Sequence, residues 1–179
     1  MKIENWKLNI IQVIPAIGII LFAVVLRLLP HPANFAPIAA LALFGGVYLD
    51  KKVAFMLPVV AMLISDFILG FHASMAAVYG SFLMTVGIGI WIKTHKSLRN
   101  VILASLSSSI IFFVLTNFNF WYADALYPKT MPGLLMSYIN AVPFFRNTIL
   151  GDLFYTGLFF GAYELVTSLI QIRAKAHTK

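Results

Sequence analysis

Six long apolar stretches, separated by polar connections, constrain this chain more than any other feature of its sequence. A helix that crosses a bilayer needs about 20 mostly apolar residues, and continuous apolarity without a two-residue alternation favours helices over a β-barrel. With 61% hydrophobic and only 11% charged residues, a soluble globular protein is excluded. The sequence predicts an all-α membrane protein with one integral membrane domain over residues 1–179. We expect a compact bundle of six transmembrane helices at about residues 8–29, 34–49, 53–69, 74–92, 98–117 and 148–172.

Residues that commonly cap helices stand at several of the predicted helix starts. We expect Asn34 to cap the second helix, Ser97 the fifth, and Asn147 or Thr148 the sixth. The first apolar stretch follows two lysines, as the core of a signal peptide does, but no small-x-small cleavage site comes after it. We therefore expect the first stretch to be retained as a helix.

The basic residues alternate between successive connections. All but three of the 13 Lys and Arg residues lie at the two termini or in the second-to-third and fourth-to-fifth connections. The exceptions are Arg27, Lys129 and Arg146. The positive-inside rule then places both termini in the cytoplasm of a multi-pass protein of the cytoplasmic (inner) membrane. The basic surplus is explained by topology, and no basic–aromatic pattern of the nucleic-acid-binding kind appears, so no nucleic-acid partner is expected.

Most of the remaining polar groups are expected to gather at the external face. Ionisable residues inside a membrane are costly and usually functional, so we interpret this cluster as an outward-facing substrate pocket. Two alternatives stay open: the aromatic residues form an interfacial belt, and Arg27 with Asp66 is a structural ion pair. The histidines can be ligand contacts, metal ligands or loop residues. The candidate substrate-binding residues are Arg27, His31, Asn34, Asp66, His72, Asn117, Asn119, Trp121, Tyr122, Arg146 and Asp152.

The connection between the fifth and sixth helices, residues 118–146, is predicted to be long. Its aromatic content is too high for a disordered linker, and residues 133–142 fit a short interfacial helix. We interpret it as an external lid over the pocket, with a re-entrant packing element as the alternative. Within the pocket, Arg27 and Arg146 suit a carboxylate or phosphate on the ligand. On the opposite side, Glu164 is expected near Lys or Arg residues.

Motifs for common chemistries are missing from the sequence. No Gly-rich phosphate loop, His-Glu-x-x-His or Gly-x-Ser-x-Gly occurs, and there is no cysteine. We therefore expect no enzyme activity, no cofactor and no metal site. Gly157 and Gly161 form a Gly-x-x-x-Gly pattern that favours close helix packing or docking to a partner membrane subunit.

Three stretches carry a resemblance to a known family. They are residues 27–37 (RLLPHPANFAP), 65–72 (SDFILGFH) and 117–121 (NFNFW). Together with six helices and a long last connection, they resemble the substrate-binding S component of energy-coupling factor transporters, within a group of small S-component-like bacterial membrane proteins. The resemblance covers nearly the whole chain.

The resemblance implies uptake of a water-soluble micronutrient, a vitamin or vitamin precursor, bound from outside under the loops after helices one, three and five. It implies a transmembrane coupling subunit and ATPases as partners. The chain departs from the family in two respects. Its first helix lacks the Ala-x-x-x-Ala docking surface, and it lacks the cysteine that a cobalamin-binding group uses, which leaves His72 or His31 as substitutes.

Three alternatives to this function remain at this point. The first is a solitary importer of cobalamin or another corrinoid. The second is an intramembrane enzyme that uses Asp66, Asp152 and His72 as acid–base groups. The third is a structural or assembly subunit without a ligand.

Overall fold

The computed structural model describes residues 18–123 and 125–177, with side chains described up to residue 168 and at residue 172. In this part of the chain there are six α-helices, one short 3-10 turn (η1, Lys93–His95) and no strand, which confirms the all-α class. The helices are Gly18–Leu28, α2 Ile38–Tyr48, α3 Lys51–Leu69, α4 Met75–Ile92, α5 Leu98–Ala123 and α6 Met131–His177.

Four of these segments are long and apolar enough to cross a membrane. They are Lys51–Leu69, Met75–His95, Leu98–Ala123 and Met131–Ser168. The helices Gly18–Leu28 and Ile38–Tyr48 are apolar but shorter. At 11 residues, α2 is about 16 Å long, which is well below the roughly 30 Å of a hydrocarbon core. A membrane protein with several spanning helices follows from these lengths.

The centre of the bundle is α2, which is buried at every residue except Tyr48. Its sequence is apolar on all sides, as a helix surrounded by other helices requires. It crosses α4 where Gly46 faces Gly89. A Cβ at Gly46 would lie 2.5 Å from the carbonyl oxygen of Val86, and a Cβ at Gly89 would lie 2.5 Å from that of Leu43. The two backbones therefore touch, and only glycine allows this approach.

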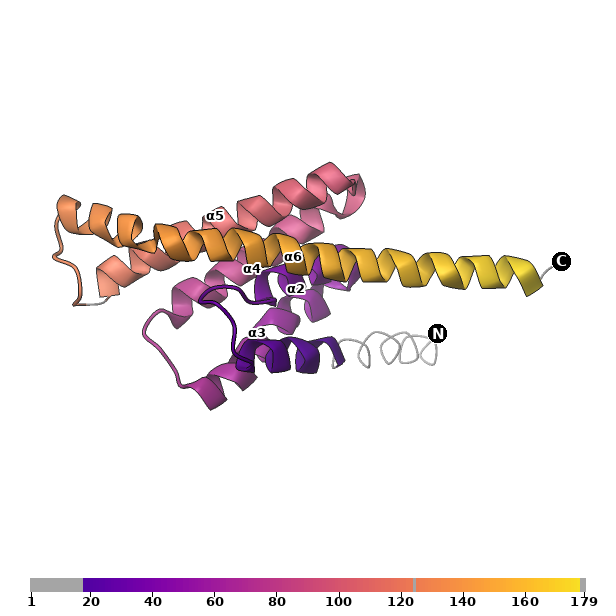
Figure 1. Ribbon diagram of the computed structural model, residues 1–179, viewed down its shortest axis with the longest axis horizontal. Coiled ribbons are helices and arrows are strands. Elements are labelled where there is room, and N and C mark those ends of the chain that lie inside the picture. The colour runs from indigo at the N-terminus through magenta and orange to yellow at the C-terminus, as the bar shows by residue number, and fades with distance from the viewer. Residues whose placement is uncertain (1–17, 124, 178–179) are drawn as a thin grey trace.

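Successive helices alternate in direction, so the connections gather at two ends of the bundle (Figure 1). We call one the pocket end; it holds residues 29–37, residues 70–74 and the connection between α5 and α6. The other, the basic end, holds residues 49–50 and 93–97. Figure 1 shows α5 and α6 running together past the other helices at the pocket end.

The prediction of a long connection over residues 118–146 is wrong. In the structure α5 continues to Ala123 and α6 begins at Met131, so the expected interfacial helix at residues 133–142 is the first part of α6. The two helices pair along this stretch: the Tyr138 hydroxyl donates to the Val114 carbonyl oxygen at 2.9 Å, and the rings of Phe113 and Phe145 have centroids 4.4 Å apart. These contacts stabilise a helical hairpin in place of a loop.

Two of the predicted helix caps are also wrong, and one is confirmed. Asn34 lies in the connection with a positive φ of 63°, and α2 begins after Pro37 instead. Asn147 and Thr148 lie inside α6. The Asn147 amide donates to the Ala33 carbonyl oxygen at 3.1 Å and so ties α6 to the first connection. At α5, the Asn100 backbone N–H donates to the Ser97 hydroxyl at 3.1 Å, as expected of a cap.

At the basic end, Glu164 lies beside a cation, as predicted. The Lys96 ammonium donates to its carboxylate at 2.5 Å, and the Tyr48 hydroxyl donates to the same oxygen at 2.8 Å. The hydrogen bond to Glu164, followed by the one to Tyr48, raises the pKa of Lys96 above its ordinary value. These contacts join α2, the α4–α5 connection and α6 at the surface of this end.

Candidate functional site

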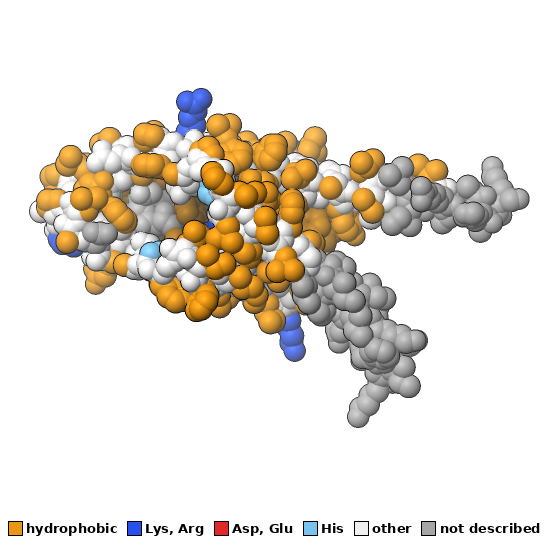
Figure 2. All heavy atoms as spheres, turned by 60° about the horizontal axis from the view of Figure 1, so that its bottom comes forward, with side chains coloured by type: hydrophobic (Ala, Val, Ile, Leu, Met, Phe, Trp, Pro, Cys, Tyr) orange, Lys and Arg blue, Asp and Glu red, His pale blue; other side chains and the backbone are white. Residues whose placement is uncertain are grey.

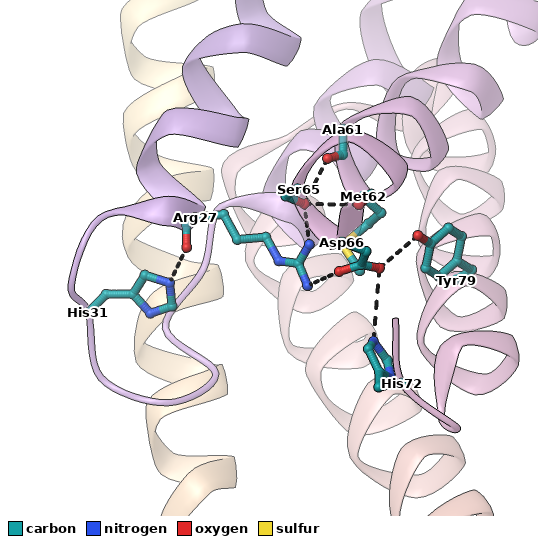
Figure 3. Close-up of polar contacts among 8 residues, drawn as sticks. All are labelled: Arg27, His31, Ala61, Met62, Ser65, Asp66, His72 and Tyr79. Atoms are coloured by element: carbon teal, nitrogen blue, oxygen red, sulfur yellow. Dashed lines mark hydrogen bonds and ion pairs between the residues drawn. The ribbon is translucent and has the colours of Figure 1, made fainter. Parts of the chain in front are cut away.

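The pocket end is organised around a buried ion pair (Figure 3). Asp66 lies near the end of α3 with its side chain 1% exposed, and the Arg27 guanidinium contacts its Oδ1 at 2.7 Å. The Tyr79 hydroxyl of α4 donates to Oδ2 at 2.7 Å. Arg27 also donates to the Ser65 hydroxyl. Both carboxylate oxygens of Asp66 therefore have partners, from two different helices.

The ion pair and the Tyr79 hydrogen bond together join three helices inside a segment that the sequence places in the membrane. A lone carboxylate is expensive in such surroundings, and a buried pair is tolerated when its remaining hydrogen-bonding positions are filled. Tyr79 donates to Oδ2 of Asp66 and Ser65 accepts from Arg27, while Oδ1 of Asp66 has the ion pair with Arg27 and no hydrogen bond among the described residues. The arrangement agrees with the alternative in which Arg27 and Asp66 form a structural pair, and it fixes the guanidinium in the wall of a cavity.

The two histidines of this end differ in their surroundings. His31 places Nδ1 2.9 Å from the Pro32 carbonyl oxygen and Nε2 3.1 Å from that of Arg27, so its ring holds the turn after the first helix. His72 is 39% exposed, and its Nε2 lies 3.9 Å from Asp66 Oδ2. Among the described residues, no three His, Cys, Asp or Glu side chains come together as a metal site requires.

Two adjoining cavities open at the pocket end. The first, which we call the charged chamber, has a volume of about 330 Å³ and is lined by Arg27, His31, His72 and Asp152 among others. The second, the amide chamber, has a volume of about 480 Å³. Both are lined by Asn34, Val78, Phe112 and Thr148, so the two volumes adjoin along a shared wall. Figure 2 shows a hollow in this face with histidine side chains beside it.

The amide chamber is lined by uncharged polar groups and aromatic rings. No Lys, Arg, Asp, Glu or His is among its described lining residues. Amides and hydroxyls orient a bound molecule by hydrogen bonds, and ring faces supply contact area. The polar groups are Asn34, Ser74, Thr116, Asn117, Ser137, Asn140 and Thr148, and the rings are Phe112, Phe113, Phe120, Tyr127 and Phe144.

Asp152 stands in the wall of the charged chamber, in the middle of α6 and not at its start as the sequence suggested. Its side chain is 3% exposed. The Ser109 hydroxyl of α5 donates to its Oδ2 at 2.6 Å. One helical turn further along, the Thr156 hydroxyl donates to that of Ser105 at 3.3 Å, so polar side chains line this part of the α5–α6 interface.

The structure gathers a little over half of the predicted site residues around the two chambers. Arg27, His31, His72 and Asp152 line the charged chamber, Asn117 lines the amide chamber, Asn34 lines both, and Asp66 lies behind Arg27.

The other four predicted residues line neither chamber. Tyr122 is 69% exposed, Arg146 is exposed, and the Trp121 indole donates to the Pro128 carbonyl oxygen at 2.9 Å. The side-chain nitrogen of Asn119 is buried without a hydrogen-bond partner among the described residues. Because this stretch is helical, successive residues turn to different sides, and only some of them face the chamber.

Apart from Asn117, sequence reasoning missed the lining of the amide chamber that comes from α5 and α6. On α6 the chamber contacts residues 137, 140, 141, 144 and 148, and on α5 residues 112, 113, 116, 117 and 120. Each set has the three- and four-residue spacing of one helix face. This periodicity could have identified the lining residues, but only if the segment had been predicted to be helical. Tyr79, the partner of Asp66, was missed as well.

Comparison with other proteins gives one match. No curated protein and no solved structure matches the chain. A family model does match, over residues 7–175, which is nearly the whole sequence. The chain therefore belongs to the family described as "Family of unknown function (DUF6580)".

Proposed function

We propose that this protein is a membrane-embedded binding protein that captures a small water-soluble molecule in the two adjoining chambers at the pocket end. The observation that carries the proposal is the lining: polar and aromatic side chains from four helices and three connections converge on one cavity system. Ligand pockets commonly have volumes of about 300–1,000 Å³, with mostly apolar walls and a few placed polar groups. Volumes of about 480 and 330 Å³ fall in this range.

The resemblance to S components supports a role in uptake of a micronutrient, a vitamin or vitamin precursor. The distribution of Lys and Arg supports an orientation with the basic end and both termini in the cytoplasm. The pocket end then opens outside the cytoplasmic membrane. In this proposal the α5–α6 hairpin takes the place of the expected lid, because its inner face forms one wall of the amide chamber.

A coupling subunit with its ATPases fits the same proposal. A Cβ at Gly157 or Gly161 of α6 would meet nothing within 4 Å, so this strip of the helix is open to a neighbour. Close approach over glycine is a common way for membrane helices to associate. The strip supports docking of a partner helix in the membrane.

The geometry favours binding over the other candidates. Both oxygens of Asp66 are engaged by Arg27 and Tyr79, which leaves this carboxylate poorly suited to acid–base work. His31 faces two backbone carbonyls, so of the two histidines only His72 is placed to ligate a bound molecule. Chambers of about 480 and 330 Å³ suit a compact ligand better than a corrinoid with its macrocycle and nucleotide.

Mass spectrometry of small molecules that co-purify with the protein tests the proposal. Ala141 lines the amide chamber, so Ala141→Trp is expected to fill it and remove the bound molecule. Ala162→Trp is the matched control, because Ala162 is exposed on the same helix and lines neither chamber. We expect one compound enriched with the wild type and the control but not with Ala141→Trp. Absence of any such compound, together with no thermal stabilisation by a panel of vitamins and precursors, contradicts the proposal.

A further inference from the structure

Among the described carboxylates of the pocket end, Asp152 is the one without a cation beside it. No ion pair joins it to a described Lys, Arg or His, whereas Asp66 is paired with Arg27 at 2.7 Å. Its Ser109 partner supplies a hydrogen bond but no charge. A buried carboxylate in apolar surroundings is stable when it holds a proton or when a positive charge lies beside it. The second state needs an open volume next to the carboxylate, and the charged chamber provides that volume.

The remaining charged groups of the chamber do not favour an anion. The guanidinium of Arg27 is neutralised by Asp66, and His31 is engaged by backbone carbonyls. Arg146, which the sequence suggested as a partner for a carboxylate or phosphate, lines neither chamber. His72 lies 3.9 Å from Asp66 Oδ2, so it belongs to the cluster around the Arg27–Asp66 pair. When Asp152 is ionised, its charge is therefore the one that the described lining of the chamber leaves uncompensated.

Aromatic rings in the same wall complement a cation. Phe82 and Phe112 both line the charged chamber, and their rings stack with centroids 5.6 Å apart. The face of an aromatic ring attracts a positive charge, most strongly where water is excluded. Phe112 also lines the amide chamber, so a molecule that spans the two volumes passes its ring.

We propose that the ligand of this site carries an organic cation, an ammonium or a positively charged nitrogen heterocycle, that pairs with Asp152. The inference rests on the proposed function and adds a chemical class to it. The cationic group occupies the charged chamber, and the uncharged part of the molecule lies among the amides and rings of the amide chamber. Asp152 then sets the preference for charge, while the amide chamber sets the preference for shape.

Three probes of similar size and different charge test this assignment: benzylammonium, benzyl alcohol and benzoate. Their binding to purified protein in nanodiscs is measured by calorimetry or ligand-detected NMR, with empty nanodiscs as the reference. We expect benzylammonium to bind at least about tenfold more tightly than benzyl alcohol, and benzoate to bind most weakly, since about 1.4 kcal/mol corresponds to a factor of ten.

Asp152→Asn separates charge from shape. It keeps the size of the side chain and its capacity to accept from Ser109, so benzyl alcohol should bind as it does to the wild type while the preference for benzylammonium disappears. Thr156→Val is the control, because it removes a buried hydroxyl one turn away that does not line the charged chamber. It should leave the preference intact.

The outcomes distinguish the inference from the proposed function. Probes that bind without preference for the cation, or that prefer benzoate, overturn the assignment to Asp152 and leave a binding protein. The same holds if Asp152→Asn retains the preference. If none of the probes binds the wild type at millimolar concentration, both the chambers as a binding site and the cation assignment are contradicted.

Discussion

The two ends of the bundle use similar ion pairs in opposite surroundings. At the pocket end, Arg27 and Asp66 meet inside the protein, and the acid is 1% exposed. At the basic end, Lys96 and Glu164 meet at 2.5 Å on the surface, with side chains 38% and 56% exposed. A buried pair cannot lose one partner without leaving a charge in apolar surroundings, whereas an exposed pair is replaced by water. The ion pair at the pocket end is therefore expected to contribute much more to the stability of the fold than the ion pair at the basic end.

The contact between α2 and α4 is closer than the packing around the cavities. Near the basic end, α2 and α4 touch backbone to backbone at Gly46 and Gly89. Toward the pocket end, polar and aromatic side chains line the two chambers. Close packing gives rigidity, and a cavity gives room for a ligand. A further cavity of about 560 Å³ lies at the basic end, lined by Tyr48, Lys96 and Glu164 among others, so the close packing belongs to the α2–α4 contact and does not distinguish the two ends.

The largest stability effect is expected from Arg27→Met. The substitution leaves Asp66 buried with one hydroxyl partner and no cation, at a cost of about 3–5 kcal/mol in the free energy of unfolding. The double variant Arg27→Met with Asp66→Asn removes both charges and should recover most of the loss. Denaturation in mild detergent measures both. If the double variant is no more stable than Arg27→Met alone, the pair is not what holds this end together.

A smaller loss is expected from Gly89→Ala. The new methyl group would lie 2.5 Å from the Leu43 carbonyl oxygen, so α2 and α4 must move apart, at a cost of about 1–3 kcal/mol. Gly87→Ala on the same helix is the control, because a Cβ there meets nothing within 4 Å. It should leave stability unchanged or raise it by up to about 1 kcal/mol, since alanine favours helix. Equal effects of the two substitutions in thermal unfolding would argue against close packing of α2 on α4.

The smallest effect is expected from Glu164→Gln. The carboxylate is exposed, so its loss should change the melting temperature by little more than the error of the measurement. Any change should shrink further at high salt, because salt screens surface charges. The pKa of Lys96 should fall back toward its ordinary value, since the hydrogen bond to Glu164 is the main cause of its increase. A loss as large as that of Arg27→Met would remove the contrast between the ends.

The apolar helices and the gathering of polar groups could be predicted from the sequence more clearly than the composition of the site. Runs such as residues 53–69 and 98–117 are mostly apolar, and α3 and the start of α5 lie within two residues of the predicted bounds. Residues 118–146 mix prolines, aromatics and polar groups, which weakens the helix signal. Their helices form because α5 and α6 pair, through contacts such as Tyr138 to Val114. That stabilisation is tertiary, so local composition does not reveal it.

The same limit applies to individual site residues. Arg27 and Asp66 are 39 positions apart, and their pairing depends on how two helices turn relative to each other. The rotation of α5 about its axis decides whether Trp121 or Phe120 faces the chamber. Predicting this stretch as a loop gives no such orientation. The residue types for the site could be selected from the sequence, but their orientation required the packed helices.

Thiol labelling in intact cells tests the central claim most directly, because the chain contains no cysteine that would interfere. Asn140→Cys places a thiol in the lining of the amide chamber, and Thr94→Cys places one at the exposed basic end. A chamber open to the outside predicts that a membrane-impermeant maleimide labels Asn140→Cys in intact cells and Thr94→Cys only after permeabilisation. Labelling of Thr94→Cys in intact cells, with Asn140→Cys labelled only after permeabilisation, would contradict the account.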